Sequence, residues 1–160
     1  MAEARTRGYT EPDPRDDLNG TDVGRKLLIL AREAGHGLEL RDIRLTPLIP
    51  RRLRAGSVAR FMTALRKIDA DYAREQSAAA AEGKALRYLA SFAGRRAEVG
   101  LRRVGPGHPC FALSGSEISI ALTTANCRDQ PVVIRGPGAG ADVTATGVLA
   151  DIIRISYQEA

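Results

Sequence analysis

Four acidic side chains and one lysine lie close together between residues 9 and 26, where they could act on a small ligand: Glu11, Asp16, Asp17, Asp22 and Lys26. Asp22 and Lys26 are four residues apart, so on a helix they project from the same face about one turn from each other. Because unpaired charges are costly to bury, such a group is unsuited to a hydrophobic core. It suits a pocket for a small molecule that carries an ammonium group together with a hydroxyl or an acid.

The spacing also permits a plainer interpretation, which stays open at this point. The acids can belong to an exposed capping loop, since negative side chains are favoured near helix N-termini. Asp22 and Lys26 would then be an ordinary surface pair that contributes a few tenths of a kcal/mol, about 0.2–0.5.

The elements that position these residues can be predicted from proline, glycine and hydrophobic spacing. Pro12 and Pro14 restrict the backbone around them, which predicts a stiff, extended acidic loop. Apolar residues at helical spacing begin directly after it and predict a helix over residues 21–34. Gly35 and Gly37 end that helix. The loop therefore feeds directly into the helix that carries Asp22 and Lys26.

The remaining hydrophobic pattern predicts an α+β fold. Alternation predicts strands, two of which form a hairpin, and helical spacing predicts one long helix in the middle of the chain. The predicted strands are 43–48, 84–92, 97–104, 118–124 and 131–135, and the long helix is 57–81. The natural packing of these elements is a mixed or antiparallel sheet covered by helices.

A glycine-rich turn follows the last predicted strand and precedes a helix over residues 142–157. Gly136, Gly138 and Ala141 give a formal G-x-G-x-x-A match. By itself this match is a weak dinucleotide fingerprint, because the chain ends before a second strand could supply a ribose-binding acid. From these residues alone, a tight strand-to-helix turn that needs positive φ is the favoured explanation of the glycines.

Composition excludes several classes of protein. The chain of 160 residues is 44% hydrophobic and 27% charged, as in a globular domain. The net charge of +5 is spread over separate groups without interleaved aromatic residues, so nucleic-acid binding is not favoured. No apolar run approaches the roughly 20 residues of a membrane span and no signal peptide is evident, so we expect a cytoplasmic protein without membrane contact. Cys110 and Cys127 lack the partners of a zinc site or a disulfide framework, and no metal site is expected.

Two segments carry a resemblance to a known family. The segment 9–32, with EPDPRDDL followed by a GxDVxRK helix, closely resembles the substrate-site segment of homoserine dehydrogenase, which occurs alone or fused to aspartokinase. The C-terminal pattern RGPGAGxxVTAxGVxADI is similar to the end of the same enzymes. The resemblance implies NAD(P)-dependent interconversion of L-homoserine and L-aspartate 4-semialdehyde, on the route to threonine, methionine and isoleucine.

The resemblance also implies a role for individual residues. Glu11, Asp17 and Asp22 match the family's substrate-binding acids, which would hold the ammonium group of the substrate and an ordered water. Lys26 matches the catalytic lysine that exchanges a proton with the substrate hydroxyl, and Asp22 would assist it. Gly140 would lie against the nicotinamide cofactor, NADP or NAD. Gly24 stands where the family usually has alanine, and a glycine within a helix costs about 1 kcal/mol.

The same resemblance implies a division of the chain and a set of partners. Residues 1–130 would form a substrate-binding, catalytic and dimerisation domain. Residues 131–160 would return as a strand and helix to complete a Rossmann-type domain whose N-terminal part is absent. We therefore expect a homodimer and a fragment or split enzyme, completed by a separate chain that carries the nucleotide-binding half. The alternative is a non-catalytic amino-acid-binding or dimerisation module derived from that enzyme.

Overall fold

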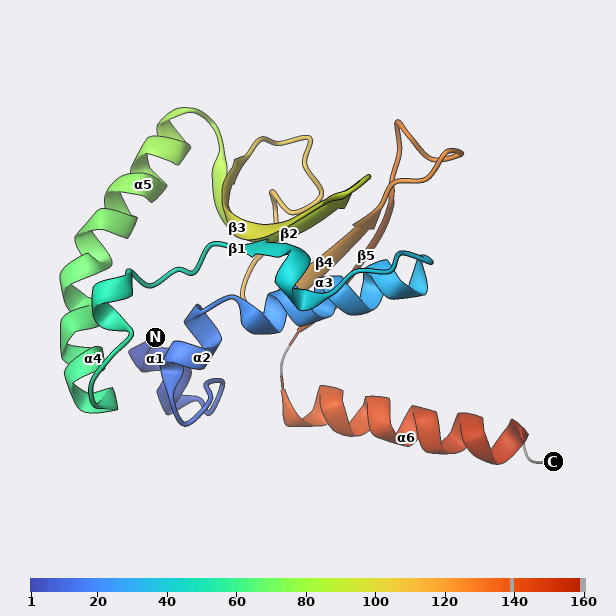
Figure 1. Cartoon of the computed structure of the whole chain (residues 1–160), viewed down its shortest axis with the longest axis horizontal. Coiled ribbons are helices and arrows are strands. Elements are labelled where there is room, and N and C mark those ends of the chain that lie inside the picture. The colour runs from blue at the N-terminus through green and yellow to red at the C-terminus, as the bar shows by residue number, and fades with distance from the viewer. Residues whose placement is uncertain (139, 159–160) are drawn as a thin grey trace. The chain divides into compact units, whose positions relative to one another are not determined.

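The structure, a computed structural model, describes residues 1–138 and 140–158 and consists of two compact units, Met1–Pro106 and Gly107–Ala160. The first unit contains α1 (Ala2–Thr6), α2 (Pro14–Leu18), α3 (Thr21–Glu33), β1 (Ile43–Leu45), α4 (Val58–Leu65), α5 (Asp69–Ala81), β2 (Ala85–Ala93) and β3 (Arg96–Val104), with short 3-10 turns η1 (Leu40–Asp42), η2 (Arg51–Leu53) and η3 (Arg66–Ile68) (Figure 1). The second contains β4 (Glu117–Leu122), β5 (Val132–Pro137) and α6 (Ala141–Gln158). The predicted domain boundary at 130/131 concerns a larger enzyme and stays a prediction.

The first unit is built on a three-stranded mixed sheet in the order β1-β3-β2. β2 and β3 form the predicted antiparallel hairpin, whose turn contains Gly94 with φ 61°, a backbone conformation that glycine adopts without strain. β1 runs parallel to β3. Helix α3 packs against the sheet through a core formed by Leu27, Ile43, Ala97 and Val99. The predicted α+β class with a mixed sheet is therefore confirmed.

Gly24 was expected only to weaken its helix, but in the structure it also has a role in packing. It is buried on the face of α3 that also carries Leu27 and Ala31. A Cβ added at residue 24 would lie 2.9 Å from Cδ2 of Leu45 and 3.4 Å from Cδ1 of Leu40. The missing side chain thus lets α3 approach β1 and η1 closely, so the glycine sets the distance between the helix and the strand.

Two predicted elements have different bounds. The strand predicted for residues 43–48 ends at Leu45, because Pro47 has no N–H to donate and Leu48 donates its N–H to Leu18 O at 2.9 Å. The single helix predicted for residues 57–81 is divided into α4 and α5 by the 3-10 turn η3. Ile68 of that turn is 3% exposed, so the change of helix type occurs where the chain is buried.

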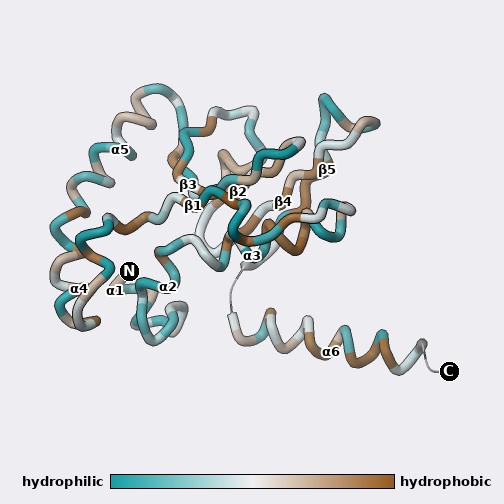
Figure 2. The backbone as a smooth tube through the Cα atoms, viewed as in Figure 1, coloured by the Kyte–Doolittle hydropathy of each residue, from teal (hydrophilic) through white to brown (hydrophobic). Residues whose placement is uncertain are grey.

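The second unit contains an antiparallel pair of strands, β4 and β5, followed by α6. The strands are thus divided between two sheets, and do not join into one sheet. Hydrophobic residues recur along α6 (Figure 2). Over residues 1–138 and 140–158, no helix is both long enough and apolar enough to cross a membrane. The cytoplasmic location stays a prediction.

Candidate functional site

The start of α3 is fixed by two contacts. Gly20 is its N-cap, with φ 85°, and the side-chain oxygen of Asn19 accepts the N–H of Thr21 at 2.7 Å. The hydroxyl of Tyr88, on β2, occupies the space beside Gly20: a Cβ there would lie 2.2 Å from it. Tyr88 donates this hydroxyl to Thr46 O at 2.9 Å. Tyr88 therefore packs beside the turn that begins α3, where a side chain at residue 20 would not fit.

Asp22 and Lys26 stand on the outward face of this anchored helix. Their Oδ2 and Nζ atoms are 2.9 Å apart, and the side chains are 67% and 59% exposed. The prediction that they share one helix face is confirmed. Both groups are open to solvent, so a ligand can reach them without displacing any part of the first unit. Asp22 and Lys26 can therefore each bind a ligand in place of the other side chain.

Glu11 and Asp17 come together by a different contact. The backbone N–H of Glu11 donates to Oδ2 of Asp17 at 3.1 Å, and both residues are exposed. The prediction that Asp16 and Asp17 lie in an extended loop is wrong, because both belong to α2. The physical reason is a strong helix start: Asp13 is a capping residue and Pro14 occupies the first helical position. Since α2 contacts α3, the acids of both helices belong to one region of the first unit.

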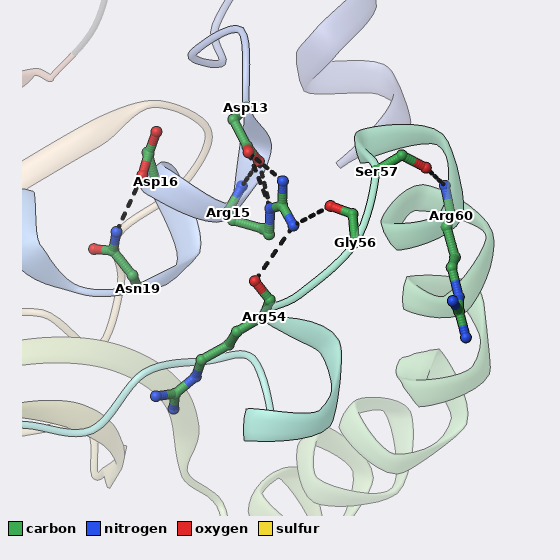
Figure 3. A network of polar contacts seen from close by, with 8 residues as sticks. All are labelled: Asp13, Arg15, Asp16, Asn19, Arg54, Gly56, Ser57 and Arg60. Atoms are coloured by element: carbon green, nitrogen blue, oxygen red, sulfur yellow. Dashed lines mark hydrogen bonds and ion pairs between the residues drawn. The ribbon is translucent and has the colours of Figure 1, made fainter.

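Arg15 is a residue of this region that the sequence did not single out. Its guanidinium forms an ion pair with Asp13 (2.5 Å) and donates to the carbonyls of Gly56 at 2.8 Å and Arg54 at 3.3 Å (Figure 3). It also lies over the ring of Phe61, 5.8 Å from the centroid. Arg15 therefore ties α2 to the loop before α4. The Asp-Pro-Arg order could have indicated the cap, but not the distant carbonyls.

Acid is expected to weaken this connection. The hydrogen bond from Arg15 lowers the pKa of Asp13 below its usual 3.8. A carboxyl group whose pKa is lower in the folded state than in the unfolded state stabilises the fold at pH values above the unfolded-state pKa. This contribution is lost as the pH falls through the folded-state pKa. We expect the Tm to fall as the pH drops below about 5, and to fall less in Asp13→Asn, which keeps a capping side chain. Thermal melts across that range with the same acid slope in both proteins would contradict this assignment.

Gly140 lies in the second unit, at the entry to α6. Its φ is 132°, which confirms the predicted need for positive φ in this turn. Its carbonyl accepts the N–H of Thr144 at 3.2 Å, and a Cβ built there would find only Cγ2 of Val143 within 4 Å, at 3.8 Å. The backbone is therefore open on the side where a side chain would stand. Ala139, between two of the glycines, lies outside the described residues.

No metal centre is formed by the part of the chain that the structure describes, where no three His, Cys, Asp or Glu side chains are grouped to hold an ion. Cys110 is buried, and Cys127 is partly buried.

Comparison with known proteins identifies the family. The family model for homoserine dehydrogenase matches residues 1–153. A bifunctional aspartokinase/homoserine dehydrogenase 1 of Zea mays is 51% identical over 159 residues, which is 98% of this chain and 17% of that protein. The chain belongs to the homoserine dehydrogenase family, and it spans about a sixth of the length of the maize relative.

Solved structures agree with this assignment. A putative homoserine dehydrogenase from Archaeoglobus fulgidus superposes with a TM-score of 0.70 at 25% identity, over 96% of this chain and 41% of that one. A hyperthermophilic archaeal homoserine dehydrogenase in complex with NADPH gives a TM-score of 0.64 at 21% identity, over 98% of this chain and 39% of that one, and so supports the fold alone.

Proposed function

We propose that this chain forms the substrate-binding part of an NAD(P)-dependent homoserine dehydrogenase, which interconverts L-homoserine and L-aspartate 4-semialdehyde. The observation that carries the proposal is the Asp22–Lys26 pair, 2.9 Å apart and exposed on a helix whose first turn is anchored by Gly20 and Tyr88. An exposed ion pair contributes little to stability, so both side chains can be replaced to test a role in ligand binding without unfolding the chain.

The chemistry of the reaction assigns a task to each group. Oxidation of the carbinol of homoserine requires removal of its hydroxyl proton. A lysine beside that hydroxyl can accept this proton only in its neutral amine form, and its ammonium form can return the proton in the reduction. The ammonium group of the substrate can compete with Lys26 for the carboxylate of Asp22. Once Asp22 binds the substrate, Lys26 is released to face the hydroxyl. Glu11 and Asp17, joined through the backbone of Glu11, supply further negative charge for the same ammonium group.

The second unit supplies a surface for the cofactor, NADP or NAD. Gly140 precedes α6 and has no side chain to prevent close approach, which fits a glycine that lies against a nicotinamide ring. When bound, the nicotinamide accepts or gives the hydride. Five apolar side chains of α6 are 46–59% exposed, namely Val148, Leu149, Ile152, Ile153 and Ile155. Such a helix suits packing against a nucleotide-binding domain, on this or another chain, and a homodimer is also part of the proposal.

The alternative function, a non-catalytic amino-acid-binding or dimerisation module, predicts binding without turnover. In that module the same acids would bind the amino acid, but Lys26 would transfer no proton. The two functions are separated by assaying the full-length protein for NAD(P)H formation from homoserine. Homoserine binding with no turnover in the presence of either cofactor would favour the module.

Asp22→Asn is expected to weaken homoserine binding by about 10–100-fold, because hydrogen bonds between charged groups contribute about 1.5–3 kcal/mol. Calorimetric titration of the chain with homoserine, with and without NADP, measures the change. Asp129→Asn is the matched control, since it removes the same charge from an exposed position outside the proposed site. Equal affinity in the two variants would show that the carboxylate of Asp22 does not bind the substrate.

A further inference from the structure

A cavity of about 550 Å³ lies beside α4 in the first unit. Three cationic side chains from three different elements line it: Arg52 of η2, Arg60 of α4 and Lys67 of η3. Arg60 and Lys67 are seven residues apart on nearly continuous helix, so they project from one face. The cavity therefore collects positive charge from elements that the fold brings together.

The cationic side chains of this cavity lack internal partners. None of the residues that line it is acidic. Among residues 1–138 and 140–158, no ion pair involves Arg52, Arg60 or Lys67. Arg103 shows the opposite arrangement, since it pairs with both Glu75 and Glu82. The positive charge around the cavity is available to a ligand.

The adjacent cavity provides a comparison within the same unit. It has a volume of about 420 Å³, and its lining includes Asp13 and Asp16 as well as Arg15 and Arg54. Positive and negative side chains thus balance there, and Arg15 is paired with Asp13. Of the two cavities, only the one beside α4 has a lining of a single sign.

The wall of the cationic cavity is held in place by hydrogen bonds. Gly56, which lines it, has its carbonyl bound by Arg15 at 2.8 Å (Figure 3). Phe61 forms a fixed inner surface, 2% exposed. The cavity is therefore formed before any ligand arrives, which lowers the cost of binding.

We propose that this cavity is a binding site for a small anion that carries phosphate groups, separate from the homoserine site. Three cations balance the two to three negative charges of a pyrophosphate group at neutral pH. Guanidinium groups bind phosphate oxygens through paired N–H donors, and a lysine adds a point charge. The volume fits a small molecule, and the three cations converge on one open cavity, unlike the scattered surface arginines elsewhere in the chain.

The test is calorimetric titration of the full chain with pyrophosphate at constant ionic strength, because salt screens exposed charges. The double variant Arg60→Gln/Lys67→Gln is expected to bind pyrophosphate at least about tenfold more weakly, since two charge-assisted contacts are removed. Arg52→Gln alone is expected to weaken binding by a smaller factor. Unchanged Tm values in these variants show that the fold is intact.

Arg66→Gln is the matched control, because Arg66 adjoins Lys67 but does not line the cavity. If Arg66→Gln and the double variant lost pyrophosphate binding equally, the loss would be due to the net charge of the protein and not to the cavity. That result would contradict the proposed site. Citrate that binds as tightly as pyrophosphate would overturn the phosphate preference. A single-stranded oligonucleotide that binds far more tightly than pyrophosphate through the same side chains would replace the small ligand with a nucleic acid. The double variant is also titrated with homoserine and is expected to bind it as the parent chain does. A failure of the phosphate site can then be told apart from a failure of the proposed dehydrogenase function.

Discussion

Lys26→Ala is expected to lower the rate of homoserine oxidation by the full-length protein by about 10²–10⁴-fold, the usual contribution of a general acid–base group. The side chain is 59% exposed and, among the described residues, forms an ion pair with Asp22 alone, so its removal should leave the fold intact. The prediction is therefore a loss of kcat with an unchanged Tm. NAD(P)H formation at saturating homoserine, together with a thermal melt, measures both quantities.

Two further variants separate proton transfer from charge. Arg25→Ala removes a positive charge from the neighbouring exposed position of α3 and should retain most of the activity. Lys26→Arg keeps the charge, but a guanidinium does not give up its proton in proteins, so it should not restore the rate. Equal losses in Lys26→Ala and Arg25→Ala, or full activity in Lys26→Arg, would contradict a proton-transfer role for Lys26.

The elements with strong local signals were predicted closely. Helix α3 begins and ends within a residue of its predicted bounds, because a hydrophobic face with 3.6-residue spacing lies between Gly20 and Gly35. The hairpin of β2 and β3 was predicted because alternation on both sides flanks Gly94. In each case the determining residues lie next to one another in the sequence, so no knowledge of tertiary packing was needed.

The features that escaped prediction depend on contacts between distant residues. Arg15 donates to the carbonyls of Arg54 and Gly56, and the sequence around Arg15 does not predict these distant partners. The early end of β1 reflects the bond from Leu48 to Leu18 as well as Pro47. The sequence predicted only that Gly24 would weaken the helix. It did not predict that the side chain of Leu45 fills the space that a Cβ would take.

The candidate site was predicted only in part, for a related reason. The spacing of Asp22 and Lys26 fixed their shared face through helix geometry alone. Their ligand came from the resemblance of a long segment to one family, because carboxylates and an amine suit many small molecules. The anchoring of that segment by Tyr88 could not be predicted, since β2 lies far along the chain from α3.

Gly20→Ala is expected to destabilise the first unit by about 2–6 kcal/mol, through two separable effects. The first is backbone strain, because φ at residue 20 is 85°, where a non-glycine residue costs about 1–3 kcal/mol. The second is a clash, because the new Cβ would lie 2.2 Å from the hydroxyl of Tyr88. Overpacking of this kind costs about 1–3 kcal/mol. Urea denaturation of the chain measures the sum.

Gly35→Ala isolates the first effect, since Gly35 has the same φ of 85° and nothing within 4 Å of its added Cβ. Tyr88→Phe in the Gly20→Ala background addresses the second, because it removes the clashing oxygen and leaves the ring carbon 3.3 Å away. The free energies of the two substitutions should then be non-additive, with the tyrosine change less harmful in the alanine background than in the parent chain. If Gly20→Ala costs no more than Gly35→Ala, Tyr88 does not hold the first turn of α3. Asp22 and Lys26 would then depend on packing at Gly24 and Leu27 for their position.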